Sequence, residues 1–401
     1  MNIKDKYKVN IIDVDNIGNG ICRIDNKVVF VKNGLLNEEL EIEITSIKKN
    51  YSSGKIINII KPSDKRVKVI CPYYDICGGC NFLHTSYSNE RDIKLKYLEK
   101  LFNTKINYLN TTNELHYRNK IVLHVLKGKL GLYNDKTHEL CEIDNCYLIN
   151  DKIALKINEL KKLDLNNIFE IMIRVINNKI MINIIGNINK FDNKCDSLYI
   201  NNKYYKGDKY LIDEINNYKF SIYPESFYQV NKEGMTNIYN EAYNFLNYSN
   251  NLLDLYCGTG TIGIWMNNKC KNITGIELNK SSIKNANINK ELNGINNIKF
   301  ICDDASNVKG NYDTIIVDPP RSGLNKKVIS YLNNSKSKNI IYISCNPNTL
   351  KRDIDLLSNY KLVKLSCADM FPRTKHIEMV MMLEKKAEKL GGMIKWKRKL
   401  F

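Results

Sequence analysis

One cysteine stands where a strand ends and a helix begins. The apolar run "NIIYIS" (339–344) predicts a buried strand, and Cys345 follows it directly. Asn346 suits the cap of a following helix, and Pro347 suits its first position. A thiol beside a helix start has its thiolate favoured, and the thiolate is the nucleophilic form. Cys345 is therefore a candidate nucleophile, with a buried structural thiol as the alternative.

A glycine-rich turn predicts a cofactor site. "DLYCGTGTIG" places Gly258, Gly260 and Gly263 after a strand and at the start of a helix, where the backbone can approach a ligand closely. Glu277 lies 17 residues after Gly260, at the end of the strand "ITGIEL", where it suits a ribose diol. The pattern fits both a nicotinamide dinucleotide and S-adenosylmethionine. Asp254 favours the latter, whose amino group can use a carboxylate.

Three further acids follow apolar runs or begin one. Asp304, in "CDDA", could reach an adenine amine or cap a turn. Asp318, in "IIVDPPRSGL", leaves a strand into two prolines that restrict the backbone. Arg321 then stands where many enzymes that methylate nucleobase amines have an aromatic residue, which favours another acceptor atom. Glu378 begins the apolar run "EMVMML", so it is either a desolvated carboxylate with a raised pKa or a glutamate that faces water.

These groups suit the methylation of a pyrimidine carbon. A ring carbon is a poor nucleophile, but a thiolate that adds to carbon 6 makes carbon 5 enolate-like and able to attack a methyl sulfonium. The carbon 5 proton must then leave, which requires a base. Cys345 and Glu378 are the candidates for these two roles.

A second group of cysteines predicts a metal site. "CPYYDICGGC" contains Cys71, Cys77 and Cys80, and "CEIDNC" adds Cys141 and Cys146. Thiolates of this kind hold zinc or an iron–sulfur cluster. The five residues between Cys71 and Cys77 favour a cluster, since zinc sites more often use pairs two to four residues apart.

Three kinds of sequence pattern must position these residues. Short strands with turn residues between them fill residues 8–60 and predict a small barrel of the OB type. A helix is expected over about 88–102, and strand-like runs dominate 118–222. After residue 225, strands alternate with helices and predict a doubly wound parallel sheet. We therefore expect units at 1–62, 63–222 (β-rich, with the cysteines) and 223–384 (Rossmann-like), followed by a basic tail at 385–401.

Composition narrows the partners and the compartment. Lys and Arg total 61 against 43 Asp and Glu, a net charge of +18, which favours a nucleic-acid partner, although heavy use of Lys across the chain is an alternative reason. The N-terminus predicts no signal peptide, and no run is long enough for a membrane helix. We expect a cytoplasmic monomer whose 12 cysteines form no disulfide framework.

The combined motifs resemble the RNA uracil-5-methyltransferase family, in the branch with a TRAM domain and an iron–sulfur cluster that mostly modifies 23S ribosomal RNA. The likeness covers residues 8–384 and rests on "GNGICRIDNKVVFVKNGLLNEEL", "CPYYDICGGC", "YRNK" (117–120), "SFYQVN" (226–231), "SCNPNTLKRD" and "FPRTKHIEMV". Asn37-Glu38 replaces the usual Gly-Glu of the first domain, and the tail lies outside the pattern.

The resemblance implies a role for each site residue. Cys345 matches the nucleophile and Glu378 the base that removes the proton. Residues implied at the S-adenosylmethionine site are Gln229, Tyr256, Thr261, Glu277, Asp304 and Asp318. Residues implied as ligands of a [4Fe-4S] cluster are Cys71, Cys77, Cys80 and Cys146.

Three other readings remain open. A transfer-RNA uridine methyltransferase shares the catalytic domain but usually lacks both the TRAM domain and the cluster. A radical methylthiotransferase carries a TRAM domain, but its Cys-x3-Cys-x2-Cys spacing is absent from this chain. A non-catalytic RNA-binding scaffold would account for the charge but not for Cys345 together with Glu378.

Overall fold

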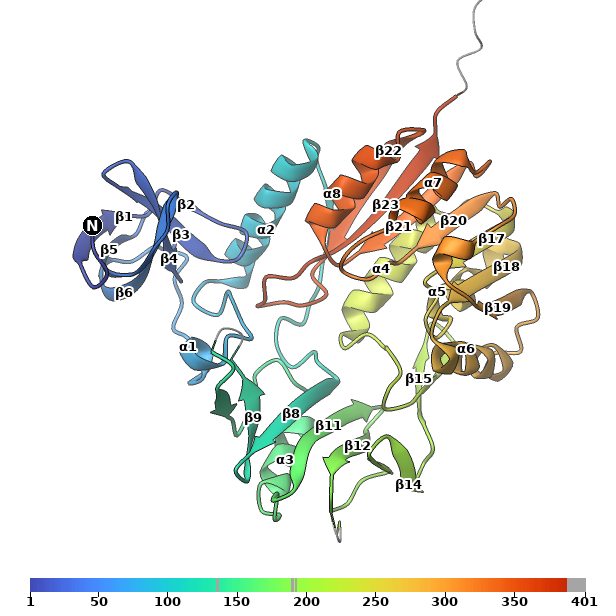
Figure 1. Cartoon of the computed structure of the whole chain (residues 1–401), viewed down its shortest axis with the longest axis horizontal. Coiled ribbons are helices and arrows are strands. Elements are labelled where there is room, and N and C mark those ends of the chain that lie inside the picture. The colour runs from blue at the N-terminus through green and yellow to red at the C-terminus, as the bar shows by residue number, and fades with distance from the viewer. Residues whose placement is uncertain (135–136, 189–190, 192, 388–401) are drawn as a thin grey trace, which may run out of the picture.

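The computed structural model describes residues 1–134, 137–188, 191 and 193–387. Three sheets and a two-stranded ribbon form its framework, with a β-unit at the N-terminus, a second sheet beside it and the largest sheet at the C-terminus (Figure 1). No helix in the described part of the chain is long and apolar enough to cross a bilayer. The predicted basic tail lies outside the described residues from residue 388 onward.

The first sheet has six strands in the order β1-β5-β6-β4-β3-β2. They are β1 (Lys6–Asn10), β2 (Asp13–Val14), β3 (Asn19–Ile24), β4 (Lys27–Lys32), β5 (Glu39–Ile47) and β6 (Tyr51–Lys61). The chain closes the sheet on itself just after β1, because Ile11 N–H donates to Glu38 O and Ile12 N–H donates to Ile21 O. This confirms the predicted OB-like barrel, with the first predicted strand divided into β1 and β2.

The second sheet has seven strands in the order β10-β9-β8-β11-β12-β13-β14, which confirms a β-rich central region. They are β8 (Lys120–Leu126), β9 (Lys129–Tyr133), β10 (Leu140–Glu142), β11 (Ile168–Ile176), β12 (Lys179–Gly186), β13 (Ser197–Ile200) and β14 (Lys203–Gly207). Helix α3 (Asp151–Leu160) packs on it through an apolar face that includes Ile153 and Ile157. The ribbon of β15 (Leu211–Ile215) and β16 (Tyr218–Ile222) leads to the third sheet.

The third sheet has eight strands in the order β19-β18-β17-β20-β21-β23-β22-β7. They are β7 (Asn107–Leu109), β17 (Ser249–Leu255), β18 (Cys270–Glu277), β19 (Ile298–Cys302), β20 (Thr314–Val317), β21 (Asn339–Ser344), β22 (Tyr360–Ala368) and β23 (Glu378–Lys385). The strands β17 to β21 are parallel, as predicted, and β23 is antiparallel to both of its neighbours. One strand from the N-terminal half, β7, joins this sheet beside β22.

Helices cover both faces of the third sheet. They are α4 (Lys232–Phe245), α5 (Thr261–Met266), α6 (Lys280–Leu292), α7 (Lys326–Asn334) and α8 (Pro347–Leu356). Neighbouring strand residues point to opposite faces, so Leu252 lies in the core with α4 to α6 and Leu253 in the core with α7 and α8. Helix α2 (Tyr87–Phe102) confirms the helix predicted over 88–102 and packs through Leu98 and Phe102 onto the second of these cores. The short helix α1 (Tyr74–Cys77) lies within the cysteine motif.

Candidate active site

A large cavity lies at the carboxyl ends of the parallel strands and has a volume of about 970 Å³. This size is within the range of small-molecule sites, with room beside a cofactor for part of a second substrate. The structure brings together at this cavity the eight residues that the family resemblance implies for catalysis and for S-adenosylmethionine. They are Gln229, Tyr256, Thr261, Glu277, Asp304, Asp318, Cys345 and Glu378.

Cys345 lies in the turn between β21 and α8. The Asn346 side chain caps the helix by accepting from Asn348 N–H at 3.2 Å, and Pro347 occupies the first turn, as the sequence predicts. Asn346 Nδ2 and Thr349 Oγ1 both donate to Arg321 O, at 3.2 and 3.3 Å. These bonds tie the turn that carries Cys345 to the turn that carries Asp318.

The environment of Cys345 corrects the expectation that its thiolate is favoured. Burial, followed by the nearby carboxyls of Glu378 and Asp318, raises the pKa of Cys345 to about 11, and only Arg321 among the side chains opposes this. Desolvation and two acids therefore outweigh the helix start. Burial and the two acids therefore favour the protonated thiol, which must lose its proton before it can attack.

Glu378 begins β23 directly beside the end of β21. The antiparallel register pairs Ser344 with Met379, so Cys345 and Glu378 are the next residues along the two strands, at the same end of the sheet. Glu378 is only 4% exposed, which excludes a glutamate that faces water. Burial and then the carboxyl of Asp318 raise the pKa of Glu378 well above its ordinary value. The strand thus presents a desolvated carboxyl to the cavity.

The glycine turn after β17 has a left-handed backbone at three positions. Tyr256, Gly258 and Gly260 have φ values of 63°, 53° and 78°, and such strain in a residue with a side chain, as at Tyr256, is concentrated at functional sites. A Cβ added at Gly258 would meet no atom within 4 Å, so the turn faces open space there. Glu277 Oε2 accepts from Gly258 N–H at 3.2 Å, which holds its carboxylate at the mouth of the turn.

Asp254 is placed differently from the prediction. It is fully buried beneath the turn, where its Oδ2 accepts from Gly263 N–H at 3.0 Å, and it is not among the residues that line the cavity. Burial, followed by Asp318, raises the pKa of Asp254 to about 8. The expected contact with an amino group of the cofactor is therefore replaced by a role in holding the glycine turn.

The other predicted residues reach the cavity from separate elements. Thr261 begins α5 and its hydroxyl lies 3.2 Å from Tyr239 Oη. Gln229 precedes α4, and its backbone oxygen accepts from Asn119 Nδ2 at 3.2 Å. Asp304 caps the short turn at residues 305–307 through Ser306 N–H, so the alternative of a capping aspartate is confirmed while the side chain still borders the cavity.

The structure adds two aromatic residues that the sequence left without a role, and it places beside them His376 and Arg118, which the sequence offers as candidate contacts for the substrate and for a phosphate. Phe227, 70% exposed, and the ring pair of Phe371 and His376, with centroids 5.9 Å apart, line the cavity and offer surfaces on which a base can stack. Arg118 lines this cavity and also the cysteine cavity described below. The sequence signal for Phe227 and Phe371 was their position inside the motifs "SFYQVN" and "FPRTKHIEMV".

The four predicted cluster ligands share a second cavity, of about 440 Å³. Its lining includes Cys71, Cys77, Cys80 and Cys146. Cys141, the other candidate, is buried in the core of the central sheet and is absent from that lining. Among the described residues, no three metal-binding side chains are close enough to share one ion. Four thiols around one cavity are a donor set that suits either an iron–sulfur cluster or a zinc ion.

Glu277 supplies the first testable prediction. The Glu277→Ala variant is expected to weaken the binding of S-adenosylhomocysteine about 10- to 100-fold, because a carboxylate that accepts from a ribose hydroxyl contributes roughly 1.5–3 kcal/mol. Isothermal titration calorimetry measures this. Glu291→Ala, which changes an exposed acid on α6, is the matched control and is expected to leave binding unchanged. If the two variants bind S-adenosylhomocysteine with equal affinity, the ribose does not contact Glu277.

Known families match two parts of the chain, the first sheet and the region of the third sheet. The family described as TRAM domain matches residues 4–57, and the family described as Methyltransferase small domain matches residues 240–333. The family described as tRNA (Uracil-5-)-methyltransferase matches residues 303–386, which include Asp304, Asp318, Cys345 and Glu378.

Whole-chain relatives agree with these matches. The chain is 31% identical to an uncharacterized RNA methyltransferase of Staphylococcus aureus, over 92% of this chain and 96% of that protein. It is 30% identical to an uncharacterized RNA methyltransferase of Clostridium acetobutylicum, over 94% of this chain and 97% of that protein. The fold is shared with the tRNA (uracil-54, C5)-methyltransferase of Pyrococcus abyssi, solved with S-adenosyl-L-homocysteine, at a TM-score of 0.81 and 23% identity, over 94% of this chain and 100% of that one.

Proposed function

The chain belongs to the S-adenosylmethionine-dependent RNA uracil-5-methyltransferase family, and from this premise we propose that it methylates carbon 5 of a uridine in 23S ribosomal RNA through a covalent adduct with Cys345. The observation that carries the proposal is the register of β21 and β23, which sets Cys345 and Glu378 side by side at one end of the cavity. A thiol and a desolvated carboxyl in this arrangement are what addition to a pyrimidine and removal of its proton require.

The proposed reaction is a sequence of bond changes at two ring carbons. S-adenosylmethionine supplies a methyl group on a positively charged sulfur. The Cys345 thiol gives its proton to solvent water, its sulfur bonds to carbon 6, and the electron pair of the carbon 5–carbon 6 double bond moves towards the oxygen on carbon 4. Carbon 5 then bonds to the methyl group as the bond from that group to the sulfonium sulfur breaks, and the electron pair of the broken bond stays on the sulfur of the leaving S-adenosylhomocysteine. Glu378 accepts the carbon 5 proton, the double bond re-forms, and the bond from carbon 6 to sulfur breaks.

The buried acids suit the charge of the donor. Burial raises the pKa of Asp318, and burial with Asp318 raises that of Glu378, so the interior disfavours the charged form of both groups. A positively charged sulfonium in the cavity would favour their ionised forms. Glu378 would then be ready to accept the proton. To reach this depth, the uridine would have to leave its stack.

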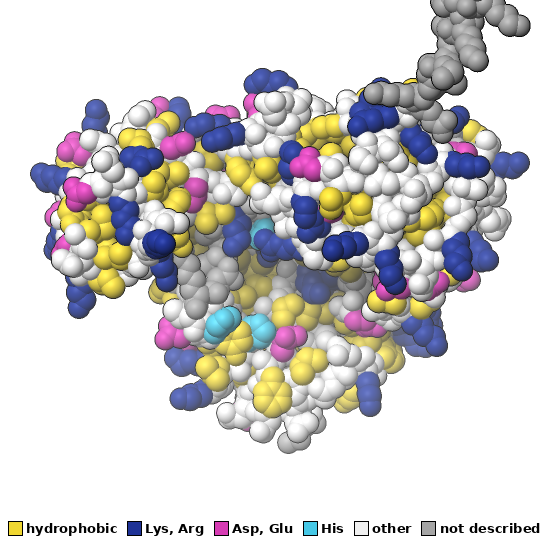
Figure 2. Space-filling model, turned by 45° about the horizontal axis from the view of Figure 1, so that its top comes forward, with side chains coloured by type: hydrophobic (Ala, Val, Ile, Leu, Met, Phe, Trp, Pro, Cys, Tyr) yellow, Lys and Arg dark blue, Asp and Glu magenta, His cyan; other side chains and the backbone are white. Residues whose placement is uncertain are grey.

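The RNA partner is supported by charge as well as by family. The chain carries a net charge of +18, and Figure 2 shows Lys and Arg side chains along the upper side of a hollow at the centre of one face, with His, Asp and Glu side chains below it. The choice of 23S ribosomal RNA rests on the resemblance to the branch that combines a TRAM domain with four cysteines. Transfer RNA is the second candidate, because a protein named as a tRNA methyltransferase shares the fold over 94% of this chain.

Mapping of the product tests both targets. The purified protein is incubated with labelled S-adenosylmethionine and with 23S ribosomal RNA or transfer RNA from cells that lack the gene, and 5-methyluridine is located by mass spectrometry. The proposal expects label at a small number of positions in 23S ribosomal RNA. Label in transfer RNA alone favours the second candidate. Native protein that labels neither RNA, while it still binds S-adenosylhomocysteine, contradicts the proposed function.

We further propose that Cys71, Cys77, Cys80 and Cys146 hold a [4Fe-4S] cluster in the smaller cavity. The support is that these four thiols, and not Cys141, line it. The methyl transfer is redox-neutral, so the cluster would serve to order residues 71–80 and the RNA-facing surface beside them. Anaerobic purification with iron analysis tests its presence, and zinc without iron would refute it.

The two cysteines of "CEIDNC" provide a matched pair of variants. Cys146→Ala is expected to lose most of the iron and of the absorbance of the reconstituted protein, because a cluster with three thiolates is released more readily. Cys141→Ala is expected to keep both, since that side chain packs in the core of the central sheet. Iron content and the visible spectrum measure this directly. Equal loss of iron in both variants would contradict the proposed ligand set.

A further inference from the structure

The loop between β22 and β23, residues 369–377, connects the catalytic sheet to the N-terminal half of the chain. It contains Phe371 and His376, both at the cavity, and it leads directly into Glu378. Arg373, in its middle, is 4% exposed and has a φ of 68°. A buried arginine in a left-handed conformation is costly unless its surroundings hold it there.

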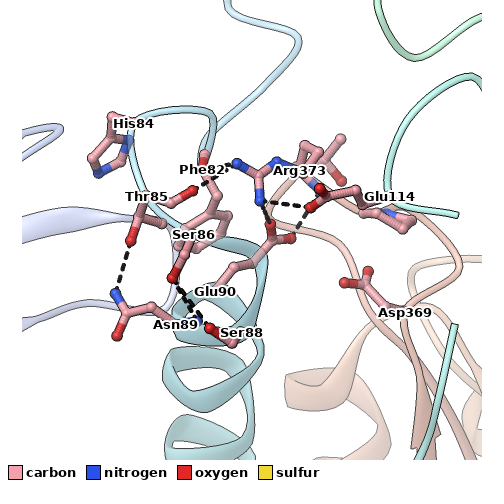
Figure 3. Close-up of polar contacts among 12 residues, drawn as sticks. Phe82, His84, Thr85, Ser86, Ser88, Asn89, Glu90, Glu114, Asp369 and Arg373 are labelled. Carbon is pink, nitrogen blue, oxygen red and sulfur yellow. Dashed lines mark hydrogen bonds and ion pairs between the residues drawn. The ribbon is translucent and has the colours of Figure 1, made fainter. Parts of the chain in front are cut away.

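Both terminal nitrogens of the Arg373 guanidinium have polar partners, whereas its buried Nε has no hydrogen-bond partner among the described residues (Figure 3). One nitrogen, Nη2, donates to Phe82 O at 2.8 Å and to Thr85 O at 2.7 Å. The other, Nη1, lies 3.2 Å from Glu90 Oε2 and 3.3 Å from Glu114 Oε2. The backbone N–H of Arg373 also donates to Glu90 Oε1 at 2.8 Å. The forked guanidinium thus joins the loop to α2 and to the segment before it, in a way that a single ammonium cannot.

The start of the loop is fixed to the same helix. Lys94 Nζ lies 3.0 Å from Asp369 Oδ1 and 2.7 Å from Glu90 Oε1, and all three side chains are buried. Together with Arg373 they form a group of two acids and two bases. Removal of one member would leave an uncompensated charge in the interior. The loop is therefore held to α2 at residue 369 and again at residue 373.

The backbone of the loop pairs with the residues that follow Cys80. Asn81 N–H and Phe82 N–H both donate to Arg373 O, at 2.8 and 3.2 Å. Lys375 N–H donates to Asn81 Oδ1 at 3.0 Å. His376 follows Lys375 directly, and Glu378 comes two residues later. These hydrogen bonds therefore help to fix the position of Glu378, the proposed base.

We infer that Arg373 is a positioning residue for the removal of the carbon 5 proton: it holds the 369–377 loop against α2 and residues 81–85 so that Glu378 meets the methylated ring. The inference rests on the proposed function and concerns one step of it. Addition of Cys345 and methyl transfer depend on the turns after β20 and β21, which have their own anchors through Arg321 O. Disturbance of the loop should therefore affect the last step more than the first two.

The Arg373→Lys variant tests this because it keeps the charge and loses the fork. With RNA that carries 5-fluorouridine, the reaction stops before proton removal, so the rate of adduct formation reports the first two steps. With ordinary RNA, the decay of the methylated protein–RNA adduct reports the last step. We expect the rate of adduct formation to stay within about threefold of the native rate. The decay of the adduct should slow about 10- to 100-fold, because a displacement of the reacting carboxylate by about 1 Å costs a factor of this size. Labelled methyl should then accumulate on a denaturation-resistant protein–RNA complex.

Arg66→Lys is the matched control, since Arg66 also pairs with a buried glutamate, Glu38, and donates to a backbone oxygen, of Asn33, but does not contact the loop. It is expected to leave the partition between adduct and product unchanged. Glu90→Gln keeps the shape of the side chain that α2 offers to Arg373, and it should also slow the decay of the methylated adduct. If Arg373→Lys does not fold, Glu90→Gln takes its place in the test.

Two results would overturn the inference. In one, both steps slow equally, which would mean that Arg373 only stabilises the fold. In the other, decay is unchanged in a folded variant. If the native protein itself forms no adduct with 5-fluorouridine RNA, the proposed function fails first, and this outcome is distinct from a failure of Arg373 alone.

Discussion

The Cys345→Ala variant is expected to lose methyl transfer by at least about 10⁴-fold while it still binds S-adenosylhomocysteine, because removal of a covalent nucleophile leaves no route to the activated ring. It should also form no adduct with RNA that contains 5-fluorouridine. Single-turnover transfer of a labelled methyl group and denaturing gel electrophoresis measure these effects. The side chain belongs to a turn whose helix cap is formed by Asn346, so the substitution leaves the local fold intact.

A matched control is Cys195→Ala, which changes a half-buried cysteine in the central region, away from both cavities. It is expected to keep native activity. A Cys345→Ala variant that methylates uridine at more than a few per cent of the native rate would contradict the covalent route. In that case the raised pKa of the Cys345 thiol would reflect a buried structural cysteine.

The second large effect is expected for Glu378→Gln. The amide has the same shape but cannot accept the carbon 5 proton, so addition and methyl transfer continue and the methylated adduct accumulates. Product formation should fall about 10²- to 10⁴-fold, the usual contribution of a general base. The test follows labelled methyl in the protein–RNA complex and in free RNA over time.

In the native protein, turnover should rise with pH, because burial and Asp318 raise the pKa of Glu378 and only its ionised form accepts a proton.

Glu384→Gln is a suitable control at the other end of the same strand. Glu384 is half-buried and lies 3.0 Å from Lys361 Nζ, far along β23 from the cavity, so the variant should behave as native. If Glu378→Gln releases methylated RNA at the native rate, another group removes the proton. If it forms no adduct at all, Glu378 acts before the methyl transfer, for example on the thiol proton of Cys345.

Much of the candidate site could be predicted from local sequence. Cys345, Asp318 and Glu277 each follow an apolar strand, and the carboxyl ends of parallel strands meet at one edge of a sheet, so a pattern of strands and turns already brings such side chains together. The cap at Asn346 and the glycine turn at 258–263 are also short-range features. These depend on residues within one or two turns of one another, which a single sequence displays directly.

The tertiary structure decided what depends on burial and on distant partners. Cys141 and Cys146 are five residues apart, yet only the packing of the central sheet shows which thiol faces the smaller cavity. The pKa of Cys345 is raised by burial and then by two carboxyls on other segments, Glu378 and Asp318, which reversed the expectation from its helix. Arg373 and Glu90 are 283 residues apart, and no periodicity links them. Local pattern determined the reactive groups of this protein, whereas long-range packing determined their protonation and their anchors, because desolvation and charge pairing exist only once the chain has folded.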